Sequence, residues 1–169
     1  MSDLSLTIRP ERPSDAAAIE KLHERAFGPG RFARTAFRVR EGGASFPAGN
    51  FVAFVATLIV GSVRLSPVSI DAGKALVLGP LTVDPAFEGR GVGSMLMRAA
   101  IDAAKAQGET LIYLVGDEPY YRRFGFKRAP AKGARLPGPV NPARFLVLEL
   151  SEGALAAASG EMRPARAAE

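Results

Sequence analysis

The stretch from Ala75 to Gln107 places the strongest constraint on the fold of this chain of 169 residues. It opens with an apolar run, Ala75–Val83, of the kind that forms a buried strand. A turn at residues 84–87 leads to the glycine-rich loop Glu88-Gly89-Arg90-Gly91-Val92-Gly93, and an amphipathic helix is predicted from Ser94 to about Gln107. The first N–H groups of a helix have no partner within it, and the helix dipole adds positive charge there. This order of elements therefore predicts an anion-binding site.

Two common phosphate-binding loops do not match this one. A Walker A loop needs Gly-Lys-Ser/Thr after four spacer residues, and that lysine is absent from the sequence here. A dinucleotide fingerprint needs Gly-x-Gly-x-x-Gly, whereas Gly93 follows Gly91 after a single residue. The spacing Glu88-x-x-Gly91-x-Gly93, after Asp84-Pro85, instead resembles the acetyl-CoA loop of the GNAT acyltransferases, Gln/Arg-x-x-Gly-x-Gly/Ala. Glu88 departs from that pattern, and a glycine turn that merely opens a helix is the alternative interpretation.

Composition narrows the class of protein. The length and a hydrophobic content of 47% fit one globular domain with a sizeable core. Without cysteine there is no disulfide, thiolate nucleophile or cysteine metal site, and we expect no metal. No apolar run is long enough to cross a membrane, and the first residues lack the core of a signal peptide, so a cytoplasmic protein is expected. The net charge of +5 suits a polyanionic cofactor or nucleic acid, but no nucleic-acid-binding motif supports the latter.

Apolar residues before the central stretch alternate in some segments and recur at helical spacing in others. The elements expected there are a strand over Leu4–Arg9, a helix from Pro13 or Ser14 up to Gly28, a short helix over Arg31–Arg40, and a hairpin with strands Phe51–Thr57 and Ile59–Ile70 and its tip at residues 58–61.

The central strand contains Gly79-Pro80, which is unusual because proline cannot donate to a strand ladder. A bulge there would splay this strand away from the neighbouring strand. The backbone groups of Leu81, Thr82 and Val83 would then be left unpaired. In the GNAT fold, which this region resembles, such groups bind the pantetheine arm of CoA like an added strand. An ordinary irregular strand is the alternative.

After the central helix, Thr110–Val115 is predicted as a strand parallel to the first, because a right-handed β-α-β unit joins them. Asp117 is expected to cap a short helix that Gly125 ends. The segment from Gly116 to Phe126, GDEPYYRRFGF, resembles the second GNAT signature, in which a tyrosine stands four residues before Gly-Phe; here that residue is Tyr121. The same segment resembles a bacterial subgroup of predicted acetyltransferases.

The predicted fold is a single-domain α/β GNAT (acyl-CoA N-acyltransferase) fold, with a mixed, splayed sheet of six to seven strands flanked by helices. We assign residues 1–150 to this N-acetyltransferase domain. A loop over Ala129–Pro142 leads to a last strand over Arg144–Leu150, and residues 151–169, which are rich in alanine, are expected to form a loosely packed tail.

The resemblance implies an N-acetyltransferase that moves an acetyl group from acetyl-CoA to an amine of a small molecule or peptide, by direct attack in a ternary complex. It implies Tyr121 as the general acid, with Tyr120 as the rival. The residues that it implies in cofactor binding are Leu81, Thr82, Val83, Glu88, Gly89, Arg90, Gly91, Val92, Gly93, Ser94, Asp117, Tyr121 and Phe124. A non-catalytic acyl-CoA-binding regulatory module of the same fold is the alternative function.

The general base and the acceptor stay open at this point. Asp117, Glu24, water or an amine that arrives neutral are the candidates for the base, and His23 is by type a further one but is more often a surface or edge residue. An acceptor pocket between the Arg31–Arg40 helix and the Ala129–Pro142 loop would have cationic walls, which favour a zwitterionic amine over a polycation. We expect no nucleic-acid or membrane partner, and a monomer or homodimer.

Overall fold

The computed structural model describes residues 5–27, 46–71 and 73–165. Within them, nine strands form a mixed sheet, and seven of these follow the order β1-β2-β3-β4-β5-β8-β6. The strands are β1 (Leu6–Pro10), β2 (Phe51–Val55), β3 (Leu58–Ile70), β4 (Gly73–Val83), β5 (Leu111–Val115), β6 (Lys127–Arg128), β7 (Ala134–Arg135), β8 (Phe145–Glu149) and β9 (Gly160–Pro164). The α-helices are α1 (Ala16–Phe27), α3 (Val92–Ala106), α4 (Glu118–Tyr121) and α5 (Ala154–Ala157).

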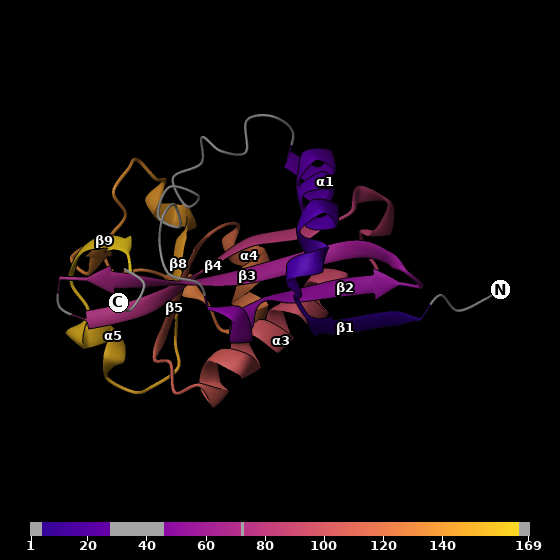
Figure 1. The fold of residues 1–169 in the computed structure, drawn as a ribbon. Helices are drawn as coiled ribbons and strands as arrows, with labels where there is room; N and C mark the ends of the chain where they lie inside the picture. The colour runs from indigo at the N-terminus through magenta and orange to yellow at the C-terminus, as the bar shows by residue number, and fades with distance from the viewer. Residues whose placement is uncertain (1–4, 28–45, 72, 166–169) are drawn as a thin grey trace.

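The two long helices cover opposite faces of the sheet (Figure 1). Apolar residues of α1 recur at helical spacing, and its buried Ile19 and Leu22 pack on Val52 of β2. On the other face, Leu96 and Met97 of α3 are fully buried in the main core. The predicted α/β class, with an open sheet between helices, is therefore confirmed.

The sheet splays beside β4, as the Gly79-Pro80 pair predicts. The register of β3 and β4 shifts there, so that Gly79 and Pro80 together stand opposite Arg64, and the peptide bond between them is cis. Among the described residues, β4 pairs with the parallel strand β5 only at Leu76 and Val77. The last three residues of β4 are bonded to β3 on one side, and no strand in the described ranges pairs with their other edge.

Several predicted element boundaries are wrong by a residue or more, among them the tip of the first hairpin and the start of the central helix. The tip of the first hairpin lies at Ala56 and Thr57 rather than at residues 58–61, which belong to β3. Ala56 adopts φ 54°, so a two-residue turn forms without glycine. The central helix begins at Val92, two residues before the predicted Ser94, because the glycine loop itself supplies its first turn.

The predicted loose tail is also wrong for residues 154–164. They form α5 and β9, and β9 pairs with β3 at Val68–Ile70 and with β7. Met162 is completely buried and Ala158 nearly so, and both belong to a second hydrophobic core, separate from the main one. The alanine-rich sequence did not indicate this strand. A single methionine anchors it, and one large apolar residue makes no recognisable pattern. β6 and β8 pair antiparallel across the long loop.

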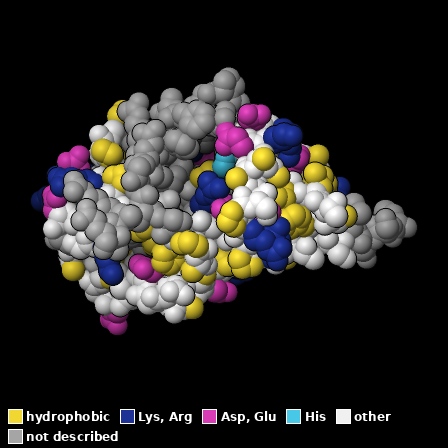
Figure 2. All heavy atoms as spheres, in the orientation of Figure 1, with side chains coloured by type: hydrophobic (Ala, Val, Ile, Leu, Met, Phe, Trp, Pro, Cys, Tyr) yellow, Lys and Arg dark blue, Asp and Glu magenta, His cyan; other side chains and the backbone are white. Residues whose placement is uncertain are grey.

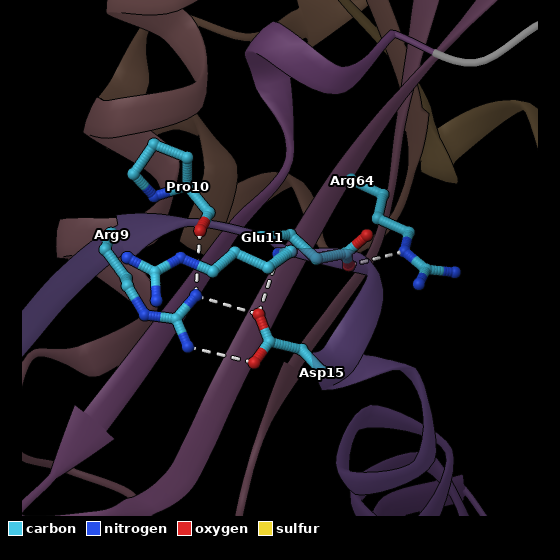
Figure 3. Close-up of polar contacts among 6 residues, drawn as sticks. Arg9, Pro10, Glu11, Asp15 and Arg64 are labelled. Carbon is cyan, nitrogen blue, oxygen red and sulfur yellow. Dashed lines mark hydrogen bonds and ion pairs between the residues drawn. The ribbon is translucent and has the colours of Figure 1, made fainter.

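Close polar contacts fix the start of α1 against β1 (Figure 3). The buried Asp15 carboxylate accepts two hydrogen bonds from the Arg9 guanidinium, at 2.8 and 2.9 Å, and a third from the Arg12 backbone N–H at 2.7 Å. Nearby, Arg64 Nε donates to Glu11 at 2.9 Å. The hydrogen bonds from Arg9, followed by that from Arg12, lower the pKa of Asp15 below its ordinary value, although burial opposes them.

These contacts predict a specific loss of stability in acid. A carboxyl whose pKa is lower in the folded chain stabilises the fold above its unfolded pKa, and this contribution is lost as the pH falls through the folded pKa. We expect Asp15→Asn to lower the free energy of unfolding by about 2 kcal/mol at pH 7. Urea titrations should show the difference from wild type narrowing below about pH 4, the ordinary aspartate value. Glu11→Gln is the matched control, with an expected loss below about 1 kcal/mol; a pH-independent Asp15→Asn effect would contradict the prediction.

Candidate active site

A cleft of about 560 Å³ opens where four parts of the chain meet: the end of β4, the glycine loop, the start of α3 and the α4 segment. The α4 segment is α4 together with the 3-10 turn Arg122–Phe124 that follows it. Ala26, near the end of α1, contributes to its wall. The lining residues are Ala26, Leu81, Thr82, Val83, Pro85, Phe87, Glu88, Gly89, Gly91, Val92, Gly93, Ser94, Tyr120 and Arg123. The predicted anion loop and the predicted free edge of β4 thus share one cleft.

The loop presents backbone donors to this cleft. Gly89 and Gly91 have φ of 77° and 81°, a left-handed conformation that glycine adopts without strain. Gly91 is the N-cap residue of α3, and no side chain caps the helix there. The first helical bond at this end runs from the Met95 N–H to the Gly91 carbonyl at 3.1 Å. The N–H groups of the intervening first turn are therefore available to an anion.

The β4 wall is fixed from the side of α1. Asp84 follows the strand, and its carboxylate accepts a hydrogen bond from the Ala86 N–H at 2.9 Å, which stabilises the turn into the loop. Arg25 of α1 donates to the same carboxylate at 3.2 Å. Thr82 is 1% exposed, and its hydroxyl oxygen has no hydrogen-bond partner in the structure. This oxygen is itself fully buried, so the wall presents the backbone of β4 rather than the Thr82 hydroxyl to the cleft.

Sequence reasoning missed Arg123 and assigned Tyr120 no binding role, yet both line the cleft. The Arg123 guanidinium lies over the Tyr120 ring, 4.8 Å from its centre. Its neighbours Arg122 and Arg128 both pair with Glu118, whereas Arg123 makes no ion pair within the described part of the chain. It is therefore a cation available to an anion. Tyr120 and Arg123 are three residues apart in a helical segment, and side chains at this spacing lie side by side. This spacing was the signal that could have predicted their contact.

Tyr121 lies beside the cleft, at the end of β5. Its ring meets Tyr120 edge to face at 4.9 Å between centroids and Phe126 at 6.1 Å. A Cβ on Gly116, the residue after β5, would collide with the Tyr121 ring, so glycine makes room for it there. Burial, followed by the nearby charges of Tyr120 and Asp117, raises the pKa of Tyr121 to about 12. The hydroxyl is therefore protonated at neutral pH.

Of the residues predicted to bind cofactor, those on β4 and in the loop line the cleft, with Arg90 as the exception. Arg90, Asp117, Tyr121 and Phe124 lie outside its lining, and their roles stay predictions. Asp117 occupies the N-cap position of α4 as expected, but its side chain does not cap the helix. Its carboxylate instead accepts from Arg144 Nη1 at 2.7 Å.

The candidates for the base and the acceptor are only partly described. His23 is buried on α1 at 7% exposure, contrary to the expected surface position, while Glu24 beside it is exposed. The Arg31–Arg40 helix lies outside the described residues. Lys132 and Arg135 of the long loop are exposed.

The surface in Figure 2 carries interspersed acidic and basic side chains over the described part of the α1 face, rather than one continuous basic patch. Within residues 5–27, 46–71 and 73–165 there is no cluster of three or more His, Cys, Asp or Glu side chains that could hold a metal ion. No helix in those same ranges has the length and apolar character to span a membrane.

Several proteins to which this chain is similar are named as acetyltransferases. The model of the acetyltransferase (GNAT) domain family matches residues 48–128. The Escherichia coli (strain K12) protein named "Uncharacterized N-acetyltransferase YhbS" is 30% identical over 157 residues, which cover 92% of this chain and 93% of that protein. A crystal structure of Escherichia coli YhbS in complex with CoA has a TM-score of 0.81 at 28% identity, covering 97% and 92% of the two chains. A Brucella melitensis GNAT acetyltransferase in complex with acetyl-CoA has a TM-score of 0.68 at 28% identity, covering 95% and 96%.

The chain belongs to the GNAT acetyltransferase family. This confirms the predicted family, and it makes the protein an acyltransferase.

Proposed function

We propose that this protein transfers an acetyl group from acetyl-CoA to the amine of a small molecule or peptide, by direct attack in a ternary complex. The observation that carries the proposal is the junction of two features in one cleft: the uncapped start of α3 and the unpaired edge of β4. The first suits a diphosphate and the second suits an extended amide-containing arm, and CoA contains both.

The residues present fit acetyl-CoA. Backbone N–H groups from Glu88 to Ser94 would hold the diphosphate, with charge from Arg90 and from the unpaired Arg123. The backbone of Leu81–Val83 would hold the pantetheine arm as an added strand. Two of the similar structures are complexes with CoA and with acetyl-CoA, which supports this choice of ligand.

When bound, acetyl-CoA supplies an activated thioester. A backbone N–H near Thr82 or Val83 would polarise the thioester carbonyl and stabilise the charge that develops on its oxygen. The protein holds the amine beside this carbonyl, so that the amine nitrogen bonds to the carbonyl carbon as the carbon–sulfur bond breaks. Tyr121 would then give its hydroxyl proton to the departing sulfur.

The β4 stretch from Leu76 to Val83 carries no acidic side chain that could act as the base. The Asp117 carboxylate is already bonded to Arg144 at 2.7 Å, and Glu24 is exposed. We therefore propose that the amine loses its proton to solvent water, before or during the attack. Activity should then rise with pH in step with deprotonation of the acceptor.

Replacing the proposed acid should slow the chemical step without weakening cofactor binding. We expect Tyr121→Phe to lower kcat about 100-fold, because general acid catalysis contributes on this order, while the Kd of acetyl-CoA changes little. Because the pKa of Tyr121 is about 12, wild-type turnover should show no alkaline decline from this group below pH 10. Tyr113→Phe, which alters a buried tyrosine of the second core, is the matched control and should leave kcat unchanged. An unchanged kcat in Tyr121→Phe would assign the role to Tyr120 or to water.

An amine panel tests the function itself. The purified chain would be assayed for CoA release with acetyl-CoA and amino acids, peptide N-termini, spermidine or kanamycin. We propose a zwitterionic acceptor, because the exposed cations of the long loop and the arginines of residues 31–40 disfavour a polycation. Preferred acetylation of spermidine or kanamycin would contradict this preference. Tight acetyl-CoA binding with no turnover on any amine would instead indicate a regulatory acyl-CoA-binding module.

A further inference from the structure

Gly93, the third glycine of the loop, is needed for a different reason from Gly89 and Gly91. A Cβ on Gly89 or Gly91 would meet nothing within 4 Å, and these residues are required for their left-handed backbone. Gly93 lies within α3, where alanine is conformationally acceptable. A Cβ on Gly93 would lie 2.6 Å from the Tyr120 hydroxyl oxygen, which is closer than carbon and oxygen can approach. Gly93 thus allows the tip of Tyr120 to rest on the first turn of α3.

Tyr120 is itself held firmly. Arg123 lies 4.8 Å over its ring centre, and Phe124 meets its ring at 66° with centroids 5.7 Å apart. On its other side, Tyr120 meets Tyr121 nearly perpendicularly, at 89° and 4.9 Å. Tyr120 therefore touches both the proposed diphosphate site and the proposed acid.

We propose that Tyr120 is a positioning residue, which fixes the α4 segment and with it Tyr121 against the start of α3, and that Gly93 is required for this contact. The role in turnover rests on the proposed function, because it acts through Tyr121. The contact itself does not, and it can be tested by stability alone.

Thermal unfolding of a double-mutant cycle tests the contact. Glycine to alanine within a helix normally stabilises, so in a Tyr120→Phe background Gly93→Ala should raise the Tm by about 2 °C. Phenylalanine lacks the clashing oxygen. The ring carbon that bears the hydroxyl in tyrosine would stand 3.8 Å from the new Cβ. In the Tyr120 background the same Gly93→Ala should lower the Tm, since the hydroxyl is forced away. A rise of equal size in both backgrounds would overturn the proposal.

Steady-state kinetics and binding test the coupling to Tyr121. Tyr120→Ala should lower kcat about tenfold with little change in the Kd of CoA, while Tyr120→Phe, which keeps the ring, should restore most of the kcat. In a Tyr121→Phe background, Tyr120→Ala should cause little further loss. Full additivity of the two losses would overturn the positioning role. If Tyr121→Phe alone leaves kcat unchanged, the acid assignment fails, and the thermal cycle still decides the contact.

Discussion

Gly93→Asp is expected to abolish CoA binding while the chain stays folded. The aspartate would place a negative charge in the cleft, beside the N–H groups that the diphosphate is proposed to use. Repulsion between unit charges near 4 Å is about 4 kcal/mol in a partly shielded site, which corresponds to roughly a 1,000-fold loss of affinity. Isothermal titration calorimetry with CoA measures the loss, and circular dichroism checks the fold.

Two companion variants separate charge from shape. Met95→Asp places the same charge in the same helix but on an exposed residue outside the cleft lining, so binding should weaken far less. Gly93→Asp combined with Tyr120→Phe should remain unable to bind, because the charge stays when the clash with the hydroxyl is removed. CoA affinity close to wild type in Gly93→Asp would show that the loop is not the diphosphate site.

Truncation after Ser151 is the second large effect that we expect. It removes α5 and β9, and with them Met162 and Ala158 from the second core. Loss of a buried methionine alone costs about 2–5 kcal/mol, a large part of the 5–15 kcal/mol that stabilises a typical domain. The truncated chain should therefore show a much lower Tm and aggregate on purification.

A shorter truncation and a point variant control this result. Removal of residues 166–169 leaves β9 complete and should leave the Tm within a few degrees of wild type. Met162→Ala keeps the strand but removes its anchor, and it should lower the free energy of unfolding by at least about 2 kcal/mol. A fully stable, monomeric chain ending at Ser151 would contradict the packing of β9 described here.

The central part of this fold could be predicted from the sequence because its signals are local. Gly79-Pro80 within an apolar run predicted the bulge, and the loop spacing up to Gly93 predicted the family, since both depend on backbone geometry that few residues permit. Much of the cleft wall followed from these two signals, because one strand and its following loop supply it.

The parts that sequence did not reveal depend on contacts between distant segments. β9 pairs with β3 across some ninety residues, and neither its composition nor its neighbours marked it as a strand. The opposite cleft wall was missed because α4, which carries Tyr120, and the 3-10 turn Arg122–Phe124, which carries Arg123, are each too short for periodicity to show which side these residues occupy.

The position of β9 has a consequence for how the chain is made. Along one edge, the first residues of β3 pair with β2, whereas Val68–Ile70 depend for their partner on β9, which is synthesised about ninety residues later. Until β9 is synthesised, this apolar edge is open to pairing with another nascent chain. Slower translation or scarce chaperones should therefore reduce the soluble yield, and this loss should depend on β9 rather than on the active-site cleft.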